Sequence, residues 1–169
     1  MFKSKVLIAN FHDIESLSGF KKIIHSIGKY YDFIDNESLH SFIYKKNRIR
    51  SACHLTFDDG YKSFFNLVLP FLKKNKIPAT LFVSPKSIVN NSNFWFQEFS
   101  YLKNNIPESY FKNYIKSFFN NSEYSKDFIK NLKLAEINSL LDYLKKQSKI
   151  EISEKFNINL DQFNIINSS

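Results

Sequence analysis

The first half of the chain alternates between two kinds of hydrophobic pattern. Four short apolar runs have the length and residue types of β-strands: 5–11, 31–34, 51–57 and 79–84. Between them, three longer segments repeat apolar residues every three or four positions, as amphipathic helices do: 16–31, 35–46 and 61–76. Ser18 is the expected N-cap of the first of these helices. Strands that alternate with helices predict an α/β layer or barrel with parallel strands.

The pattern changes beyond residue 93, where only amphipathic helices are predicted. They cover 94–103, 108–120, 125–132 and 134–147. Four parallel strands followed only by helices look incomplete, because a parallel sheet normally has both faces covered. We therefore interpret the chain as one incomplete domain, with a strand and helix core at 5–90 and a mostly helical segment at 93–169.

Composition narrows the possible classes of protein. Hydrophobic residues make up 43% of the 169 residues, which is enough for a core. The net charge of +8 is spread over expected polar helix faces, so a solvated surface is favoured over a nucleic-acid interface. The single cysteine, Cys53, excludes an intrachain disulfide and fits a buried, inert thiol. Asn10 and His12 interrupt the N-terminal apolar stretch, which is too short for a signal peptide or a transmembrane segment, so we expect a cytoplasmic protein.

Two adjacent acids, Asp58 and Asp59, directly follow the predicted strand at 51–57 in the run LTFDDG. Ligand sites in α/β folds lie at the carboxyl ends of the strands, and Gly60 lets the chain turn tightly there. Neighbouring carboxylates repel each other, so one of them needs a cation or a proton. A divalent metal would satisfy one acid and leave the other as a base. The alternative is that one acid only caps the helix that begins near Tyr61.

The segment 55–85, LTFDDGYKSFFNLVLPFLKKNKIPATLFVSP, resembles the first motif region of the polysaccharide deacetylases, also called NodB-homology or carbohydrate esterase family 4 proteins. NFHDI at 10–14 and FWFQEF at 94–99 are similar to further segments of that family. The resemblance implies that 1–169 is the N-terminal portion of a single domain of this kind. It would be an incomplete distorted (β/α) barrel, with the segment 93–169 as a helical insertion after the fourth strand. The resemblance also implies metal-dependent hydrolysis, with zinc as the expected ion, of N- or O-acetyl groups on a carbohydrate substrate.

Carried over to this chain, the family motif assigns roles to the two acids. Asp58 would be the general base, and Asp59 would bind the metal. We place three further residues on the substrate side of the site or along its lining: His12, Thr56 and Gly60. His12 ends the first strand, so it is expected on the same rim as the acids.

The chain departs from the family pattern after this motif. The family completes its metal site with H-[ST]-x-x-H, but the four histidines of this chain all precede the motif and no two are four apart: His12, His25, His40 and His54. We expect His25 and His40 to be ordinary helix residues, His54 to be a satisfied interior residue, and Trp95 to pack on a helix.

With one carboxylate ligand, a metal would bind weakly or not at all, and this chain alone is expected to be inactive. Two interpretations stay open. The favoured one is a fragment of a longer deacetylase, and the alternative is a non-catalytic carbohydrate-binding or partner module of the same fold.

Overall fold

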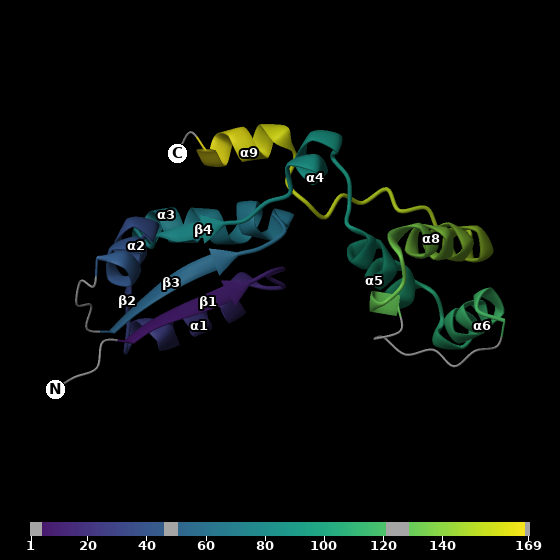
Figure 1. Ribbon diagram of the computed structural model, residues 1–169, viewed down its shortest axis with the longest axis horizontal. Coiled ribbons are helices and arrows are strands. Elements are labelled where there is room, and N and C mark those ends of the chain that lie inside the picture. The colour runs from purple at the N-terminus through teal and green to yellow at the C-terminus, as the bar shows by residue number, and fades with distance from the viewer. Residues whose placement is uncertain (1–4, 46–50, 121–128, 168–169) are drawn as a thin grey trace. The chain divides into compact units, whose positions relative to one another are not determined.

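The computed structural model describes residues 5–45, 51–120 and 129–167. The chain divides into two compact units (Figure 1). The sheet unit comprises Met1–Ser92 and Phe156–Ser169, and the helical unit comprises Asn93–Lys155. Residues 156–169, which follow the helical unit, belong to the sheet unit.

A parallel four-stranded sheet forms the centre of the sheet unit. Its strands are β1 (Lys5–Phe11), β2 (Asp32–Phe33), β3 (Ser51–Phe57) and β4 (Ala79–Leu81). The central strand β3 pairs with β1 along its whole length, with β2 near its start, and with β4 over its last three residues. The predicted mixed α/β fold with parallel strands is confirmed. Among the described residues the sheet is open and does not close into a barrel.

The described helices of the sheet unit include those predicted between the strands. They are α1 (Leu17–Gly28), α2 (Asn36–Tyr44), the π-helical turn η1 (Phe64–Val68), α3 (Leu69–Asn75), α4 (Pro85–Asn90) and α9 (Leu160–Asn167). The N-cap of α1 is Ser16 and not Ser18 as predicted, because extended Ser16 places its hydroxyl to accept a hydrogen bond from the Gly19 N–H at 3.1 Å. Helix α4 was not predicted, although Ser84 followed by Pro85 is a typical helix start.

Pro70 explains why the predicted helix at 61–76 is not uniform. Proline has no N–H to donate and its ring crowds the preceding turn. The chain adapts with the π-helical turn, in which the Leu69 N–H donates to the Phe64 carbonyl five residues back. Pro70 then lies in the first turn of α3, where a proline is tolerated.

One face of β3 builds the core of the sheet unit. Cys53, Leu55 and Phe57 alternate onto the same face and are fully buried. They pack in one cluster with residues of α1, η1 and α3: Phe20, Ile24, Phe64, Val68 and Leu72. The opposite face of β3 carries the polar pair His54 and Thr56, so β3 separates an apolar layer from a polar one.

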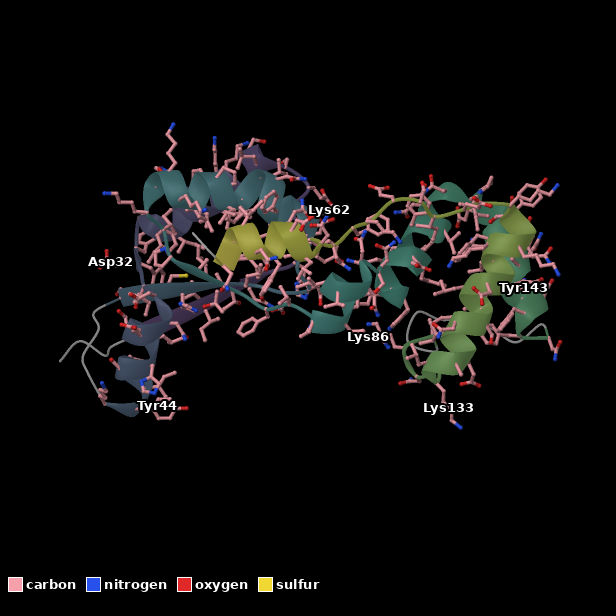
Figure 2. The ribbon with its side chains drawn as sticks, turned by 90° about the horizontal axis from the view of Figure 1, so that it is seen from above. Asp32, Tyr44, Lys62, Lys86, Lys133 and Tyr143 are labelled. Atoms are coloured by element: carbon pink, nitrogen blue, oxygen red, sulfur yellow. The ribbon has the colours of Figure 1, made fainter. Side chains whose placement is uncertain are left out.

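The helical unit has its own core. Helices α5 (Trp95–Asn105), α6 (Glu108–Phe118) and α8 (Leu134–Ser148) bury residues from all three: Phe99, Leu102, Phe111, Ile115, Ile137, Leu140, Leu141 and Leu144. Trp95 packs partly against this core, as predicted. The ring centroids of Tyr143 on α8 and Phe118 on α6 lie 5.3 Å apart. Tyr143 is labelled in Figure 2. Residues 125–128, the first half of the predicted helix at 125–132, lie outside the described residues.

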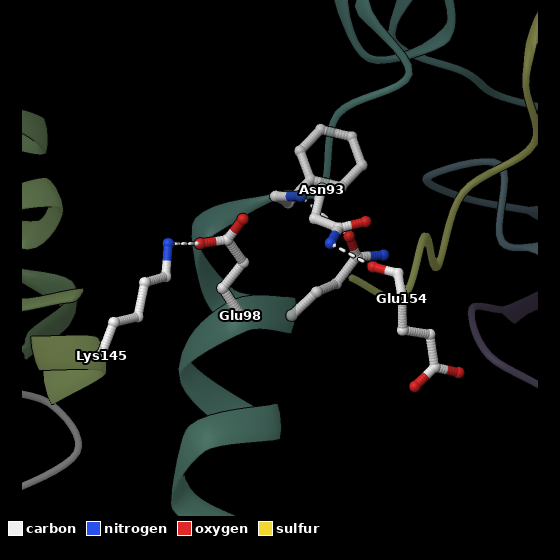
Figure 3. Close-up of polar contacts among 6 residues, drawn as sticks. Asn93, Glu98, Lys145 and Glu154 are labelled. Carbon is white, nitrogen blue, oxygen red and sulfur yellow. Dashed lines mark hydrogen bonds and ion pairs between the residues drawn. The ribbon is translucent and has the colours of Figure 1, made fainter. Parts of the chain in front are cut away.

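Two polar contacts support the helical unit (Figure 3). Lys145 Nζ lies 2.6 Å from Glu98 Oε2 and joins α8 to α5. The Asn93 side-chain amide donates to the Glu154 carbonyl at 2.8 Å and ties the first residues of the unit to its last. Within the described ranges, none of the helices combines the length and the apolar character that crossing a membrane requires.

Candidate functional site

The two acids occupy a turn just beyond the central strand, and we call residues 58–60 the acid turn. Strands β1 and β3 end in register, with Phe11 opposite Phe57. The Asp58 N–H still donates to the Phe11 carbonyl at 2.9 Å, so Asp58 extends the parallel pairing by one residue. Asp59 and Gly60 then both adopt a φ of 67°. The chain leaves extended geometry at Asp59, so the side chains of the two acids are not forced onto opposite faces as in a strand.

Gly60 is required by the shape of this turn. Its positive φ is a conformation that side chains with a Cβ rarely adopt, although aspartate visits it more readily than most, as at Asp59. A Cβ on Gly60 would lie 3.1 Å from Val83 Cγ1 and 3.5 Å from Ile158 Cγ1. Gly60 is buried, and it contributes only backbone atoms to the acid turn.

A short hydrogen-bond network fixes the Asp58 carboxylate. The Thr56 hydroxyl donates to Asn10 Oδ1 at 2.9 Å, and Asn10 Nδ2 donates to Asp58 Oδ2 at 2.9 Å. His12 Nε2 lies 3.7 Å from the same Asp58 oxygen. Asp58 thus faces β1 and the loop after it, which differs from the alternative in which it caps the next helix. The structure brings His12, Thr56 and Asp58 together at one rim, where the sequence places them.

Asn10 is a site residue that sequence reasoning missed. It lies directly opposite Thr56 in the β1–β3 register and connects Thr56 to Asp58. The signal was present, because Asn10 and His12 follow the same period of two as Thr56 and Asp58.

Burial and two neighbouring groups shift the pKa of the Asp59 carboxyl. Burial raises the pKa of the Asp59 carboxyl, His12 acts in the opposite direction, and the neighbouring Asp58 raises this pKa further. His12 and Asp58 thus act on the pKa of the Asp59 carboxyl in opposite directions. The His12 side chain is 57% exposed and that of Asp58 is 33% exposed, so the group opens to solvent.

His54 is buried, and both of its ring nitrogens have partners. Nδ1 lies 2.9 Å from the Ile34 carbonyl oxygen, and Nε2 lies 3.1 Å from Thr80 Oγ1. A carbonyl only accepts, so Nδ1 donates to Ile34, and Nε2 shares a hydrogen bond with the Thr80 hydroxyl. With both nitrogens engaged, His54 is a satisfied interior histidine, as predicted. His25 and His40 are exposed on α1 and α2.

The chain that returns from the helical unit also contacts the acid turn. Residues 156–158 form a short antiparallel bridge centred on Tyr61 and Asn157. The Ile158 N–H donates to the Gly60 carbonyl at 2.8 Å, and the Lys62 N–H donates to the Phe156 carbonyl at 2.8 Å. Lys62 is labelled in Figure 2. This pairing was not predicted, although FNINL at 156–160 alternates apolar and polar residues as a strand does.

The donors at this rim fall short of a complete metal centre. Among the residues that the structure describes, no group of three or more histidine, cysteine, aspartate or glutamate side chains is placed to hold an ion. The acid turn supplies carboxylates, and His12 is the imidazole nearest to them.

Comparisons with known proteins find similarity over parts of this chain. Residues 45–128 match the model of the polysaccharide deacetylase family. This part of the chain is therefore similar to polysaccharide deacetylases. Among solved structures, the Streptococcus pyogenes deacetylase PplD in complex with acetate is similar at 19% sequence identity and a TM-score of 0.38. That match covers 50% of this chain and 44% of PplD, so the chain spans less than half of that structure. A search of curated proteins found no match.

Proposed function

We propose that the acid turn belongs to the catalytic centre of a metal-dependent carbohydrate deacetylase, of which this chain holds one part. The reaction would remove N- or O-acetyl groups from a carbohydrate. The observation that carries the proposal is the pair of adjacent carboxylates just beyond the central strand, one of which accepts a hydrogen bond from Asn10 on the neighbouring strand. The family match over residues 45–128 supports it. In this reading the open parallel sheet is a portion of a distorted barrel.

Asp58 is the residue that we assign as general base. Asn10 and His12 both approach its Oδ2, so Oδ1 is the oxygen that we assign to accept a proton from the attacking water. Thr56 fixes the orientation of the Asn10 amide, because its hydroxyl donates to Asn10 Oδ1. A carboxylate that is already oriented loses little freedom when it takes up the proton, which favours general base catalysis.

Asp59 is the residue that we assign as a metal ligand. Burial and the repulsion from Asp58 both disfavour its charged form, and a divalent cation would relieve both. A catalytic zinc site usually has three protein ligands, and the described residues do not supply such a set. The residues present therefore do not make a complete zinc site. We expect this chain alone to bind a metal weakly and to be inactive.

A non-catalytic carbohydrate-binding or partner module of the same fold is the second candidate. The observation that favours it is the same shortage of ligand groups among the described residues. The two candidates differ in whether binding of an acetylated sugar depends on a metal and on Asp59.

The experiment is acetate release from acetylated chito-oligosaccharides and acetylated xylan in excess Zn²⁺ or Co²⁺. It compares the wild-type chain with Asp58→Asn, Asp59→Asn and a control, Asp161→Asn, which removes an exposed acid of α9. We expect no release above the background of the metal alone. Turnover that Asp58→Asn and Asp59→Asn abolish, but Asp161→Asn does not, would show that the site is complete and that our expectation of inactivity is wrong.

Sugar binding in the same samples separates the two candidate functions. Binding of acetylated chito-oligosaccharides, followed by NMR, should require the metal and be lost in Asp59→Asn if the deacetylase assignment is right. Binding that needs no metal and survives Asp59→Asn would reject that assignment and support the non-catalytic module.

A further inference from the structure

The chain leaves for the helical unit and returns from it at one place in the sheet unit. Ser92 is the last residue before the helical unit and Phe156 is the first after it. Asn157, one residue further on, donates from its side-chain amide to the Ser92 carbonyl at 3.1 Å. These two residues are 65 positions apart in the sequence, so this contact closes the whole helical segment into a loop.

Asn157 is buried in this position and is held by a polar cluster. Its side chain is 3% exposed, and Nδ2 also contacts Ser87 Oγ at 3.0 Å. Ser87, itself 4% exposed, donates from its hydroxyl to the Ser92 carbonyl at 2.6 Å. Polar groups with so little exposure are costly to leave without partners, so the cluster defines one position for Asn157.

The backbone on both sides of Asn157 holds the acid turn. The Phe156 carbonyl accepts from the Lys62 N–H, and the Ile158 N–H donates to the Gly60 carbonyl, both at 2.8 Å. These bonds hold the far end of the turn, while the Asp58 N–H and the Phe11 carbonyl hold its near end. Asp59 has a positive φ and no strand partner, so its place depends on these two anchors.

We propose that Asn157 is a positioning residue for the acid turn. Its buried amide fixes residues 156–158, and their backbone bonds fix Gly60 and thereby the Asp59 carboxylate. The inference rests on the proposed function for the role of Asp59 as a metal ligand. It adds to that function a dependence of the site on the segment that returns from the helical unit. Groups that orient metal ligands typically change metal affinity about 10- to 100-fold when they are removed.

The test uses the full ¹⁵N-labelled chain with Asn157→Ala, the milder Ser87→Ala, and the control Asn159→Ala. Asn159 is a matched control because it lies on the same segment, but its Oδ1 accepts from the Gln162 N–H and caps α9. Amide hydrogen exchange reports on the Ile158 and Lys62 N–H groups, with the amides of β3 as an internal reference. Mn²⁺ titration, followed by paramagnetic broadening of the Gly60 amide signal, reports on the site in the same samples, and Asp59→Asn is included in that titration.

We expect Asn157→Ala to lower the protection of the Ile158 and Lys62 amides about 10-fold, as the loss of a buried hydrogen bond predicts. Ser87→Ala should have a smaller effect in the same direction, and it carries the test if Asn157→Ala does not fold. The Mn²⁺ midpoint should rise about 10-fold in Asn157→Ala and stay unchanged in Asn159→Ala.

Two results would overturn the inference. Unchanged protection of both amides in Asn157→Ala and Ser87→Ala would show that the cluster does not fix the turn. Lower protection with an unchanged Mn²⁺ midpoint would show a structural role only. A wild-type titration that does not depend on Asp59 would instead reject the proposed role of Asp59, and the exchange data would still decide whether Asn157 fixes the turn.

Discussion

Replacing Gly60 with alanine should destabilise the chain, and the structure permits the magnitude to be worked out. The φ of 67° at Gly60 costs a residue with a Cβ about 1–2 kcal/mol. The new methyl group would also lie 3.1 Å from Val83 Cγ1, so neighbouring atoms must shift. Alanine restricts the unfolded chain and returns about 0.4–1 kcal/mol. The net expectation for Gly60→Ala is a loss of about 1–3 kcal/mol, since the backbone cost and the close contact add.

Gly28→Ala is the matched control within the same unit. Gly28 ends α1 without a positive φ, and its Cβ would meet Phe33 Cε2 at 3.4 Å, an ordinary contact. Alanine should therefore leave the free energy of unfolding unchanged or raise it by up to about 1 kcal/mol.

Urea denaturation followed by circular dichroism measures both variants, and the melting temperature provides a second reading at about 2–4 °C per kcal/mol for a chain of this size. We expect Gly60→Ala to lower the free energy of unfolding and Gly28→Ala not to lower it. If Gly60→Ala is as stable as the wild type, or more stable, the left-handed geometry of the acid turn is wrong.

Three further predictions concern charge, packing and thiol chemistry. Asp59→Asn should stabilise the chain at pH 7 by about 0.2–1 kcal/mol, because burial disfavours the charged carboxylate and asparagine accepts the positive φ. The pKa of Asp59 is raised in the folded chain, so this gain should disappear as the pH falls below about 4, where aspartate becomes protonated in both the folded and the unfolded chain. Urea denaturation across this pH range measures the gain. A gain that does not change with pH would contradict the raised pKa of Asp59. Leu144→Ala, at a fully buried position of α8, should cost about 2–5 kcal/mol in thermal or urea unfolding, whereas Leu134→Ala, at a position 61% exposed, should cost far less; equal losses would refute the core of the helical unit. The Cys53 thiol is fully buried and burial raises its pKa, so it should react with a thiol reagent only after denaturation, and rapid reaction in the native state would contradict its position in β3.

Sequence patterns were sufficient where local physics determines the structure. The strand at 51–57 has the bounds of β3, because an apolar run followed by Asp-Asp-Gly signals both a buried strand and its end. The acids and His12 were placed on one rim because the carboxyl ends of parallel strands lie together. That inference needs only the order of strands and helices and no knowledge of distant contacts.

The features that the sequence did not reveal depend on distant partners. The pairing of residues 156–158 with the acid turn is short, and its partner lies far away in the chain, so no local pattern selects it over a loop. The role of Asn10 depends on the β1–β3 register, which places its amide between Thr56 and Asp58. The π-helical turn before Pro70 is a third case. The sequence shows that Pro70 conflicts with a regular helix at 61–76, but a kink and a π-helical turn would each relieve that conflict.

The measurement that tests the central claim most directly is the location of a divalent cation on the wild-type chain. Mn²⁺ added to the ¹⁵N-labelled chain should broaden first the amide signals of the acid turn and of His12, and this selective broadening should vanish in Asp59→Asn but persist in Asp161→Asn. Broadening that begins elsewhere, or that is unchanged in Asp59→Asn, would contradict the account of the acid turn as the metal-binding part of a deacetylase site.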